Sequence, residues 1–360
     1  MDRRLKSILA LVLALAMVFT LAMGCTTTED DADEEETTTE EPTTDIKAAM
    51  VTDVGGLGDK SFNDLAHAGL IMGEDEWGME IEVLESNEIA DYEPNVDQLV
   101  NAGYDVIYTV GFLMTDTTNA KAAEYPDAFF GGIDQFFEAP ADNQVGLLFK
   151  ENEASYLAGV VAGMMTMDAT LHDSLNDANV IGFVGGMEIP PVQKFEAGYI
   201  AGARSVNPDV EVISLYVGNF EDTAKAKELG LTAIEKGADI VFAAAGLPGA
   251  GVAQACIEQG ALFVGVDADQ FETLPEAEDV IITSAIKRVD MAVFLTTQAV
   301  VEGTFEGGIR EFGLADDGVG LAPYHNFEDV VTQEIKDAVD AATADVIDGT
   351  VEVPGDPSTL

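Results

Sequence analysis

The hydrophobic pattern divides residues 46–285 into short apolar runs that alternate with longer amphipathic segments. Apolar runs of this length predict buried strands, and the amphipathic stretches between most of them predict helices. The nine predicted strands are KAAMVT (47–52), EIEVLE (80–85), VIYTV (106–110), AFFGGI (128–133), NVIGFVG (179–185), EVISLY (211–216), IVFAAAG (240–246), LFVGVD (262–267) and VIITSAI (280–286). Because parallel strands need a crossover connection, usually a helix, this alternation predicts parallel sheets.

Two doubly wound α/β lobes account for these strands better than a single sheet, which would have to hold too many of them. We place the N-terminal lobe at residues 46–149 and the C-terminal lobe at 150–285. Residues 286–360, which include the helix-like segment KRVDMAVFLTTQAVVEG, are expected to cross between the lobes. Ligands of open parallel sheets bind beyond the carboxyl ends of the strands, so two facing lobes would form a cleft.

The N-terminal end has the features of an export signal. Arg3, Arg4 and Lys6 precede an apolar run over 8–22, which is followed by LAMGC. Such a run falls short of a membrane span of ~20 residues, and small residues at its end are typical of cleavage. We therefore predict a lipoprotein signal peptide over 1–24, with Cys25 acylated at the mature N-terminus. An uncleaved membrane anchor is the alternative, and both place the rest of the chain outside the cytoplasm.

An acidic segment follows the cysteine. Residues 26–44 contain nine acidic residues and no basic residue or large apolar side chain. Such a segment is solvated and repels itself, because it has no apolar surface to bury. We predict a Thr/Glu-rich tether over 25–45 that links the lipid to the folded part.

The whole chain is strongly acidic, with 67 acidic and 16 basic residues and a net charge of −51. Residues 1–24 hold three basic residues and one acidic, so 13 basic and 66 acidic residues remain after cleavage. No basic patch could offset repulsion by phosphates, which excludes nucleic-acid binding. We attribute the charge to an exported surface adapted to high salt, where it is screened.

Neither a metal site nor a catalytic motif is evident in the sequence. His67, His172 and His325 are scattered without metal-ligand spacing, and Cys256 sits in an apolar-periodic segment where a helix would bury it. The GLPGAG turn (246–251) loosely imitates a dinucleotide fingerprint, but its glycine spacing is wrong. No G-x-S-x-G, H-E-x-x-H or Cys–His combination is available for hydrolysis. We therefore predict a protein that is not an enzyme and has no cofactor or metal.

The segment after the first predicted strand carries the most informative motif, DVGGLGDKSFNDLAHAGL (53–70). Its glycines let the backbone turn closely, and the residues from Asp59 on open a helix. Asp59 or Ser61 can simply cap that helix. Capping explains Phe62 and Asn63 less well, which favours a binding role at this strand end.

This segment resembles the basic membrane lipoprotein family of ABC-transporter substrate-binding proteins, also called the purine nucleoside receptor family. The likeness continues, in the family's order, over nearly the whole folded region. Its further blocks are GFLMTD (111–116), ASYLAGVVAG (154–163), GFVGGMEIPPVQKFEAGYIAGA (182–203), GNFEDTAKAKELG (218–230), AAAGLPGAG (243–251), VGVDADQ (264–270) and TSAIKRVDMAVF (283–294).

The resemblance implies a type I periplasmic-binding-protein fold, in which two Rossmann-like lobes joined by a hinge hold a nucleoside between them. Carried over by matching motif, the implied ligand-binding residues are Asp59, Phe62, Asn63, Asp116, Phe220, Gly246, Asp267 and Lys287. Phe62 and Phe220 would lie against the base and Asp267 would accept from ribose hydroxyls. Where relatives commonly have an aromatic residue four positions past the asparagine, this chain has His67, which leaves base preference open.

The physical chemistry agrees with this transfer. A nucleoside offers a flat apolar ring and a polar diol, which suit aromatic faces and paired acceptors in a dry cleft. A carboxylate that accepts from two hydroxyls makes charge-assisted hydrogen bonds. Lys287 and Arg288 follow one another at a strand end, although pairing with the plentiful surface acids would also explain them.

The resemblance further implies a monomeric receptor, anchored by lipid to the outer face of the cytoplasmic membrane, that delivers its ligand to ABC permease subunits. Two alternatives stay open at this point. The same fold can bind a sugar or small signalling molecule, since fold does not fix the ligand. The protein can also be a surface receptor that feeds no permease.

Overall fold

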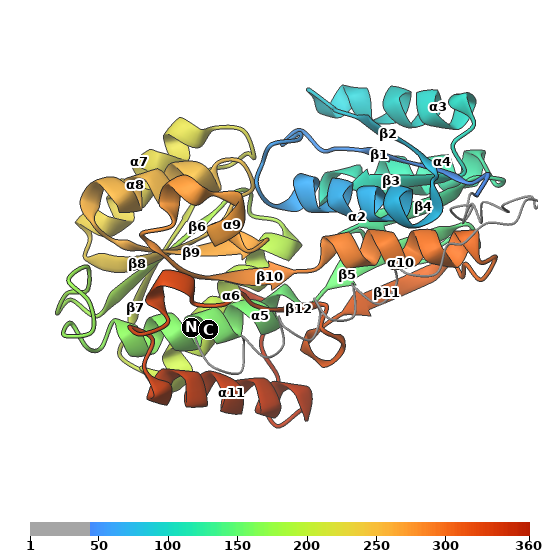
Figure 1. Cartoon of the computed structure of the whole chain (residues 1–360). Coiled ribbons are helices and arrows are strands. Elements are labelled where there is room, and N and C mark those ends of the chain that lie inside the picture. The colour runs from blue at the N-terminus through green and yellow to red at the C-terminus, as the bar shows by residue number, and fades with distance from the viewer. Residues whose placement is uncertain (1–43) are drawn as a thin grey trace, which may run out of the picture. The chain divides into compact units, whose positions relative to one another are not determined.

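Two six-stranded sheets organise residues 44–360, the part of the chain that the computed structural model describes (Figure 1). The predicted signal peptide over 1–24, Cys25 and all but the last two residues of the predicted tether lie outside the described residues. Within residues 44–360, no helix has the length and apolar character needed to cross a membrane.

The N-terminal lobe is built on a wholly parallel sheet in the order β11-β5-β4-β3-β1-β2. Its strands are β1 (Lys47–Val51), β2 (Glu80–Leu84), β3 (Val106–Val110), β4 (Phe129–Ile133), β5 (Gln144–Phe149) and β11 (Gly308–Phe312). Its helices are α2 (Phe62–Trp77), α3 (Tyr92–Ala102), α4 (Thr115–Glu124) and α10 (Val289–Val301). Successive residues of β1 face opposite sides, as a pleated strand requires. Ala48 and Met50 pack in the core with α2 and α10, while Ala49 and Val51 pack with α3 and α4.

The C-terminal lobe repeats this arrangement on a sheet in the order β12-β10-β9-β8-β6-β7, in which only β12 runs antiparallel to its neighbour. Its strands are β6 (Val180–Gly185), β7 (Glu211–Tyr216), β8 (Ala238–Ala244), β9 (Leu262–Asp267), β10 (Ile281–Lys287) and β12 (Val319–Leu321). Its helices are α5 (Glu151–Met165), α6 (Pro190–Val206), α7 (Thr223–Glu235), α8 (Gly249–Gln259), α9 (Gln270–Thr273) and α11 (Gln333–Ile347). Phe183 and Phe242 face α5 and α6, whereas Val184 and Val241 face α7 and α8, where Cys256 is fully buried.

The chain passes between the lobes three times: from β5 to α5, from β10 to α10, and from β11 to β12. The three connections lie side by side, because Lys150 N donates to Phe312 O at 2.9 Å and Arg288 N donates to Gly318 O at 2.9 Å. The rings of Phe149 and Phe312 stack there with centroids 5.3 Å apart. These three adjacent connecting segments form the hinge that joins the lobes in Figure 1.

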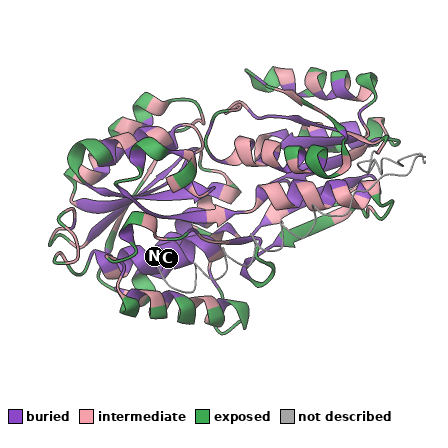
Figure 2. Ribbon diagram, in the orientation of Figure 1, coloured by how far each residue is buried: buried purple, intermediate pink, exposed green. Residues whose placement is uncertain are grey.

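All nine predicted strands occur, as β1 to β4 and β6 to β10, and the segment from Lys287 contains α10. The hydrophobic pattern does not predict β5, β11 or β12. Both sheets are buried on both faces by helices, whose outer surfaces are exposed (Figure 2). This layering leaves only the ends of the strands free to contribute polar side chains to a site.

Candidate functional site

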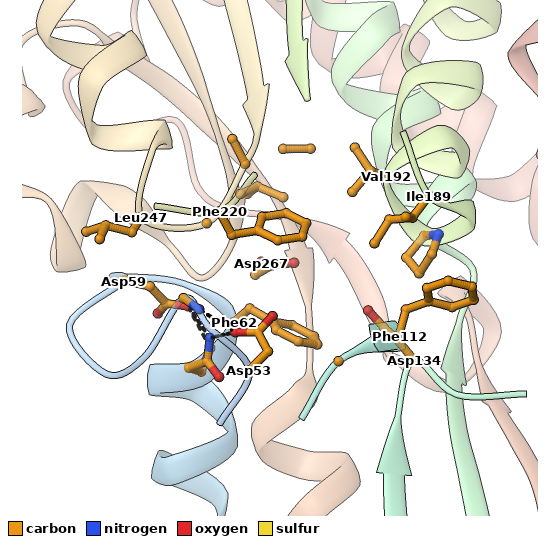
Figure 3. A pocket seen from close by; sticks show the side chains of 18 of the residues that line it. Asp53, Asp59, Phe62, Phe112, Asp134, Ile189, Val192, Phe220, Leu247 and Asp267 are labelled. Atoms are coloured by element: carbon orange, nitrogen blue, oxygen red, sulfur yellow. Dashed lines mark hydrogen bonds between the residues drawn. The ribbon is translucent and has the colours of Figure 1, made fainter. Parts of the chain in front are cut away.

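A cavity with about 620 Å³ of empty space lies between the carboxyl ends of the strands of the two lobes (Figure 3). The N-terminal lobe contributes loops after β1, β3 and β4, and the C-terminal lobe contributes loops after β6 to β10. Its lining residues are Asp53, Gly55, Asp59, Phe62, Asn63, Gly111, Phe112, Leu113, Asp134, Ile189, Pro191, Val192, Phe195, Phe220, Ala244, Ala245, Gly246, Leu247, Val266, Asp267 and Lys287.

Most of the residues predicted to bind a ligand line this one cavity. They are Asp59, Phe62, Asn63, Phe220, Gly246, Asp267 and Lys287. Asp116 is the exception, because it is exposed in the first turn of α4 and does not line the cavity. His67 is half-buried on α2 and also lies outside the lining. The structure therefore brings together residues from 59 to 287, while their role in binding stays a prediction.

The carboxylate of Asp59 accepts hydrogen bonds from the start of α2. It accepts from the backbone N–H groups of Ser61 at 3.0 Å, Asn63 at 2.8 Å and Asp64 at 3.2 Å, and from the Asn63 amide at 3.1 Å. The three backbone donors are among the N–H groups at a helix start that have no partner within the helix. Asp59 thus caps the helix and fixes the side chain of Asn63 at the edge of the cavity.

Asp53 joins this network from the end of β1. Its Oδ1 accepts from Gly55 N at 2.9 Å and from Asn63 Nδ2 at 3.0 Å. The Asn63 amide nitrogen is therefore shared between two carboxylates, which turns its carbonyl oxygen away from both. Burial raises the pKa of Asp53 to about 6, against the opposing effect of its hydrogen bonds to Asn63 and Gly55.

Lys287 is the cation at the centre of the site, and it is 1% exposed. Its Nζ lies 2.6 Å from Asp134 Oδ2 and 3.0 Å from Glu151 Oε1, within the hinge. The ammonium also lies 4.9 Å from the ring centroid of Phe62 and 5.0 Å from that of Phe149. Burial lowers the pKa of Lys287, but the neighbouring carboxylates more than reverse this effect, so the lysine stays charged.

Asp134 and Asp267 bring two more carboxylates to the cavity. Burial raises the pKa of Asp134 to about 6 and that of Asp267 to about 7, with Lys287 acting in the opposite direction on both. Ser61 Oγ donates to Asp267 Oδ2 at 2.5 Å across the cleft. Four carboxylates and one lysine line the cavity, so acceptors outnumber donors.

Three buried oxygens of the cavity accept no hydrogen bond from any described residue: Asn63 Oδ1, Asp134 Oδ1 and Asp267 Oδ1. A buried acceptor without a partner is costly, so such atoms call for an explanation. Phe62 from the N-terminal lobe and Phe220 from the C-terminal lobe supply aromatic surface beside them (Figure 3). The arrangement suits a flat molecule that carries several N–H or O–H donors.

The sequence pattern does not single out Asp53, Asp134 or the apolar wall at the start of α6. That wall consists of Ile189, Pro191, Val192 and Phe195. Asp134 follows a predicted strand directly, so the strand-end argument applied to Asp267 would have found it. The wall carried no such signal, because apolar helix residues usually pack in a core.

Comparisons with known proteins agree with this architecture. A family described as "ABC transporter substrate-binding protein PnrA-like" matches residues 46–356. The chain is 37% identical to an uncharacterized lipoprotein of Pyrococcus abyssi, over 76% of this chain and 68% of that one. It is 35% identical to the ABC transporter nucleoside-binding protein BmpA of Lactococcus lactis, over 86% and 90% of the two chains. An ABC transporter solute-binding protein of Aeropyrum pernix superposes with a TM-score of 0.78 at 28% identity, over 87% and 95% of the chains. The predicted fold class and family are confirmed.

Proposed function

Because the chain belongs to the PnrA-like family of ABC transporter substrate-binding proteins, we propose that it binds a purine nucleoside in the interlobe cavity and delivers it to a permease. The family consists of receptors for small molecules rather than enzymes. A bound molecule would contact both lobes, so it would stabilise their closed arrangement. The permease would then recognise the closed, loaded form.

The assignment to a nucleoside rests on three acceptor oxygens that accept no hydrogen bond from any described residue, in a cavity that Phe62 and Phe220 also line. A ribose diol offers O–H donors to Asp267 and Asp134, and a purine ring offers a flat face to Phe220 or Phe62. N–H groups on the edge of a base would satisfy Asn63 Oδ1. BmpA of Lactococcus lactis, which is 35% identical to this chain, is itself called a nucleoside-binding protein, and this name supports the same ligand class.

A sugar is the competing ligand, since hydroxyls and an aromatic face also suit carbohydrates. A free sugar would use the carboxylates, but it offers neither a flat aromatic ring to Phe62 and Phe220 nor the N–H donors of a base edge to Asn63 Oδ1. Anionic ligands fit poorly, because Asp53, Asp59, Asp134 and Asp267 all line the cavity, and among the described lining residues only Lys287 opposes them. We therefore expect nucleosides to bind more tightly than their 5′-phosphates.

Lipid anchoring at Cys25 is part of the same proposal. The motif LAMGC and the acidic segment after it fit a tethered receptor, and a relative from Pyrococcus abyssi is called a lipoprotein. Cells fed labelled palmitate should incorporate it into the wild-type protein but not into Cys25→Ser. Equal incorporation into both would contradict acylation at this residue.

A thermal-shift screen of the purified protein tests the ligand class. Adenosine, guanosine, inosine and uridine would be compared with D-ribose, free bases and nucleoside monophosphates in high salt. Saturating ligand at about 100 times its Kd stabilises a protein by about 2.7 kcal/mol, which raises the unfolding temperature by several degrees. We expect this rise with at least one purine nucleoside, and chromatography should recover the nucleoside unchanged. A rise in unfolding temperature with ribose alone would indicate that the ligand is a sugar and not a nucleoside.

A further inference from the structure

The cleft is bridged at one rim by direct hydrogen bonds between the lobes. The carbonyl oxygen of Lys60, in the N-terminal lobe, accepts from Thr273 Oγ1 at 2.9 Å and from Gln270 Nε2 at 3.3 Å. Both donors lie on α9 of the C-terminal lobe. The adjacent Ser61 Oγ donates to Asp267 Oδ2. One short loop of the N-terminal lobe is therefore bonded to three residues of the opposite lobe.

Both sides of this contact are held in place by their own lobes. Gln270 Oε1 accepts from Val266 N at 3.3 Å and Gln270 N donates to Ser284 Oγ at 3.1 Å, which leaves the amide nitrogen free to face Lys60. On the other side, Lys60 has a φ of 60°. Non-glycine residues rarely adopt this left-handed conformation, and they cluster where the surrounding structure fixes them. The loop and α9 are thus ordered for contact with each other.

Thr273 and Gln270 do not line the cavity. We propose that the two side chains and the Lys60 carbonyl form an interlobe latch, which stabilises the closed arrangement without touching the ligand. Thr273 and Gln270 then act as positioning residues for ligand retention. Apparent affinity falls with the fraction of protein that is competent to bind, so a weaker latch lowers affinity from a distance. The effect on ligand affinity rests on the proposed function, whereas the stabilisation of the closed arrangement by the latch does not.

Thr273→Val is the variant that isolates the latch, because it removes a hydroxyl from a half-buried residue and keeps the shape of the side chain. Thr273→Ser keeps the hydroxyl and should behave like the wild type. Thr343→Val is the matched control: its hydroxyl also donates to a backbone carbonyl, that of Val339 at 2.8 Å, but within α11 of one lobe. Each valine variant loses one hydroxyl-to-carbonyl bond, and only one of those bonds crosses the cleft.

The readout is the distance between spin labels on the two lobes in the absence of any ligand. Glu93→Cys on α3 and Glu228→Cys on α7 are exposed and outside the cavity, and Cys25→Ser leaves only the fully buried Cys256. One hydrogen bond changes a closed-to-open ratio by about fivefold. We expect Thr273→Val to lower this ratio by that factor and Thr343→Val to leave it unchanged. Dissociation of a bound nucleoside should accelerate by a similar factor.

Three results would contradict the latch. Thr273→Val could give the same distance distribution as Thr343→Val, or Thr273→Ser could open to the same extent as Thr273→Val. The ligand-free wild type could also show no closed component. Failure of every nucleoside to bind would contradict the proposed function instead. The ligand-free distances would still decide the latch.

Discussion

Lys60, Asp134 and Asp267 share an uncommon backbone conformation, with φ of 60°, 61° and 62°. A non-glycine residue in this region costs of order 1–3 kcal/mol and persists only where its surroundings fix it. All three lie at the cleft: Asp134 and Asp267 line the cavity, and Lys60 bonds the opposite lobe. At the residue scale, three of the six described non-glycine residues with a positive φ therefore lie at the cleft, whereas Asn179, Asp317 and His325 lie outside the cavity lining.

Asp267→Ala should weaken nucleoside binding at least about 100-fold, because the variant loses charge-assisted hydrogen bonds worth roughly 1.5–3 kcal/mol each. Circular dichroism should show an unchanged fold, since the substitution removes a buried carboxylate rather than core packing. Asp116→Ala is the matched control, because this exposed aspartate lies outside the cavity and should bind normally. Equal affinities of Asp267→Ala and wild type would remove Asp267 from the site.

The raised pKa of Asp267, about 7, predicts how stability depends on pH. An unfolded aspartate has a pKa near ~3.9, so between about pH 4 and pH 7 the folded protein holds a proton that the unfolded chain has lost. The free energy of unfolding therefore falls as pH rises through this window. Asp267→Asn has no such proton to lose, so it should gain stability relative to wild type by on the order of 1–3 kcal/mol from pH 4 to pH 7.

Denaturant unfolding of the two proteins at several pH values measures this difference. The comparison cancels the titration of the many surface acids, which both proteins share. A difference that stays constant across the window would mean that Asp267 titrates normally in the folded protein.

At the scale of elements, α5 and α6 pack with their backbones unusually close. A Cβ at Gly159 would overlap Tyr199 O, and one at Gly202 would overlap Tyr156 O. These neighbours are backbone atoms, which cannot move aside as a side chain would. The glycines are therefore required by helix packing, and α5 begins directly at the hinge.

Gly202→Ala should destabilise the protein by about 1–3 kcal/mol or more, because it overpacks this interface. Gly320→Ala serves as the control, since a Cβ there meets no atom within 4 Å. Thermal unfolding compares the two, and we expect a lowered transition for Gly202→Ala alone. Similar transitions would show that α5 and α6 can separate at little cost.

Of the three strands that the sequence did not predict, β11 and β12 differ physically from the predicted strands, whereas β5 is buried and largely apolar like them. β1, β3, β8 and β9 are buried on both faces and read as continuous apolar runs. β11 is an edge strand with three exposed residues in the middle, Ile309, Arg310 and Glu311, so it has no apolar run. β12 has only three residues, and its place beside β10 depends on the tertiary fold.

Residues of the site likewise differ in whether a local sequence pattern predicts them. Asp267 ends a predicted strand and Lys287 directly follows one, so the topology rule placed both at the cleft from sequence. The pairing of Lys287 with Asp134 and Glu151 joins positions far apart in the chain, which no local pattern encodes. The resemblance of GFLMTD predicted Asp116 as a ligand-binding residue, whereas the structure places it in the exposed first turn of α4, outside the cavity lining.

At the scale of the whole molecule, the net charge of −51 opposes compactness. Salt shortens the range of repulsion between surface carboxylates, from about 30 Å at 0.01 M to about 3 Å at 1 M. We therefore expect the unfolding temperature to rise as sodium chloride increases from 0.01 M to 1 M. An unfolding temperature independent of salt would show that self-repulsion contributes little to stability.

The central claim is that one nucleoside binds between the two lobes, and isothermal titration calorimetry of the wild-type protein in high salt tests it most directly. We predict saturable binding with a stoichiometry of one for at least one of adenosine, guanosine and inosine, and much weaker binding of the matching 5′-monophosphate. The absence of heat from every nucleoside, together with saturable binding of D-ribose or another sugar, would contradict the account.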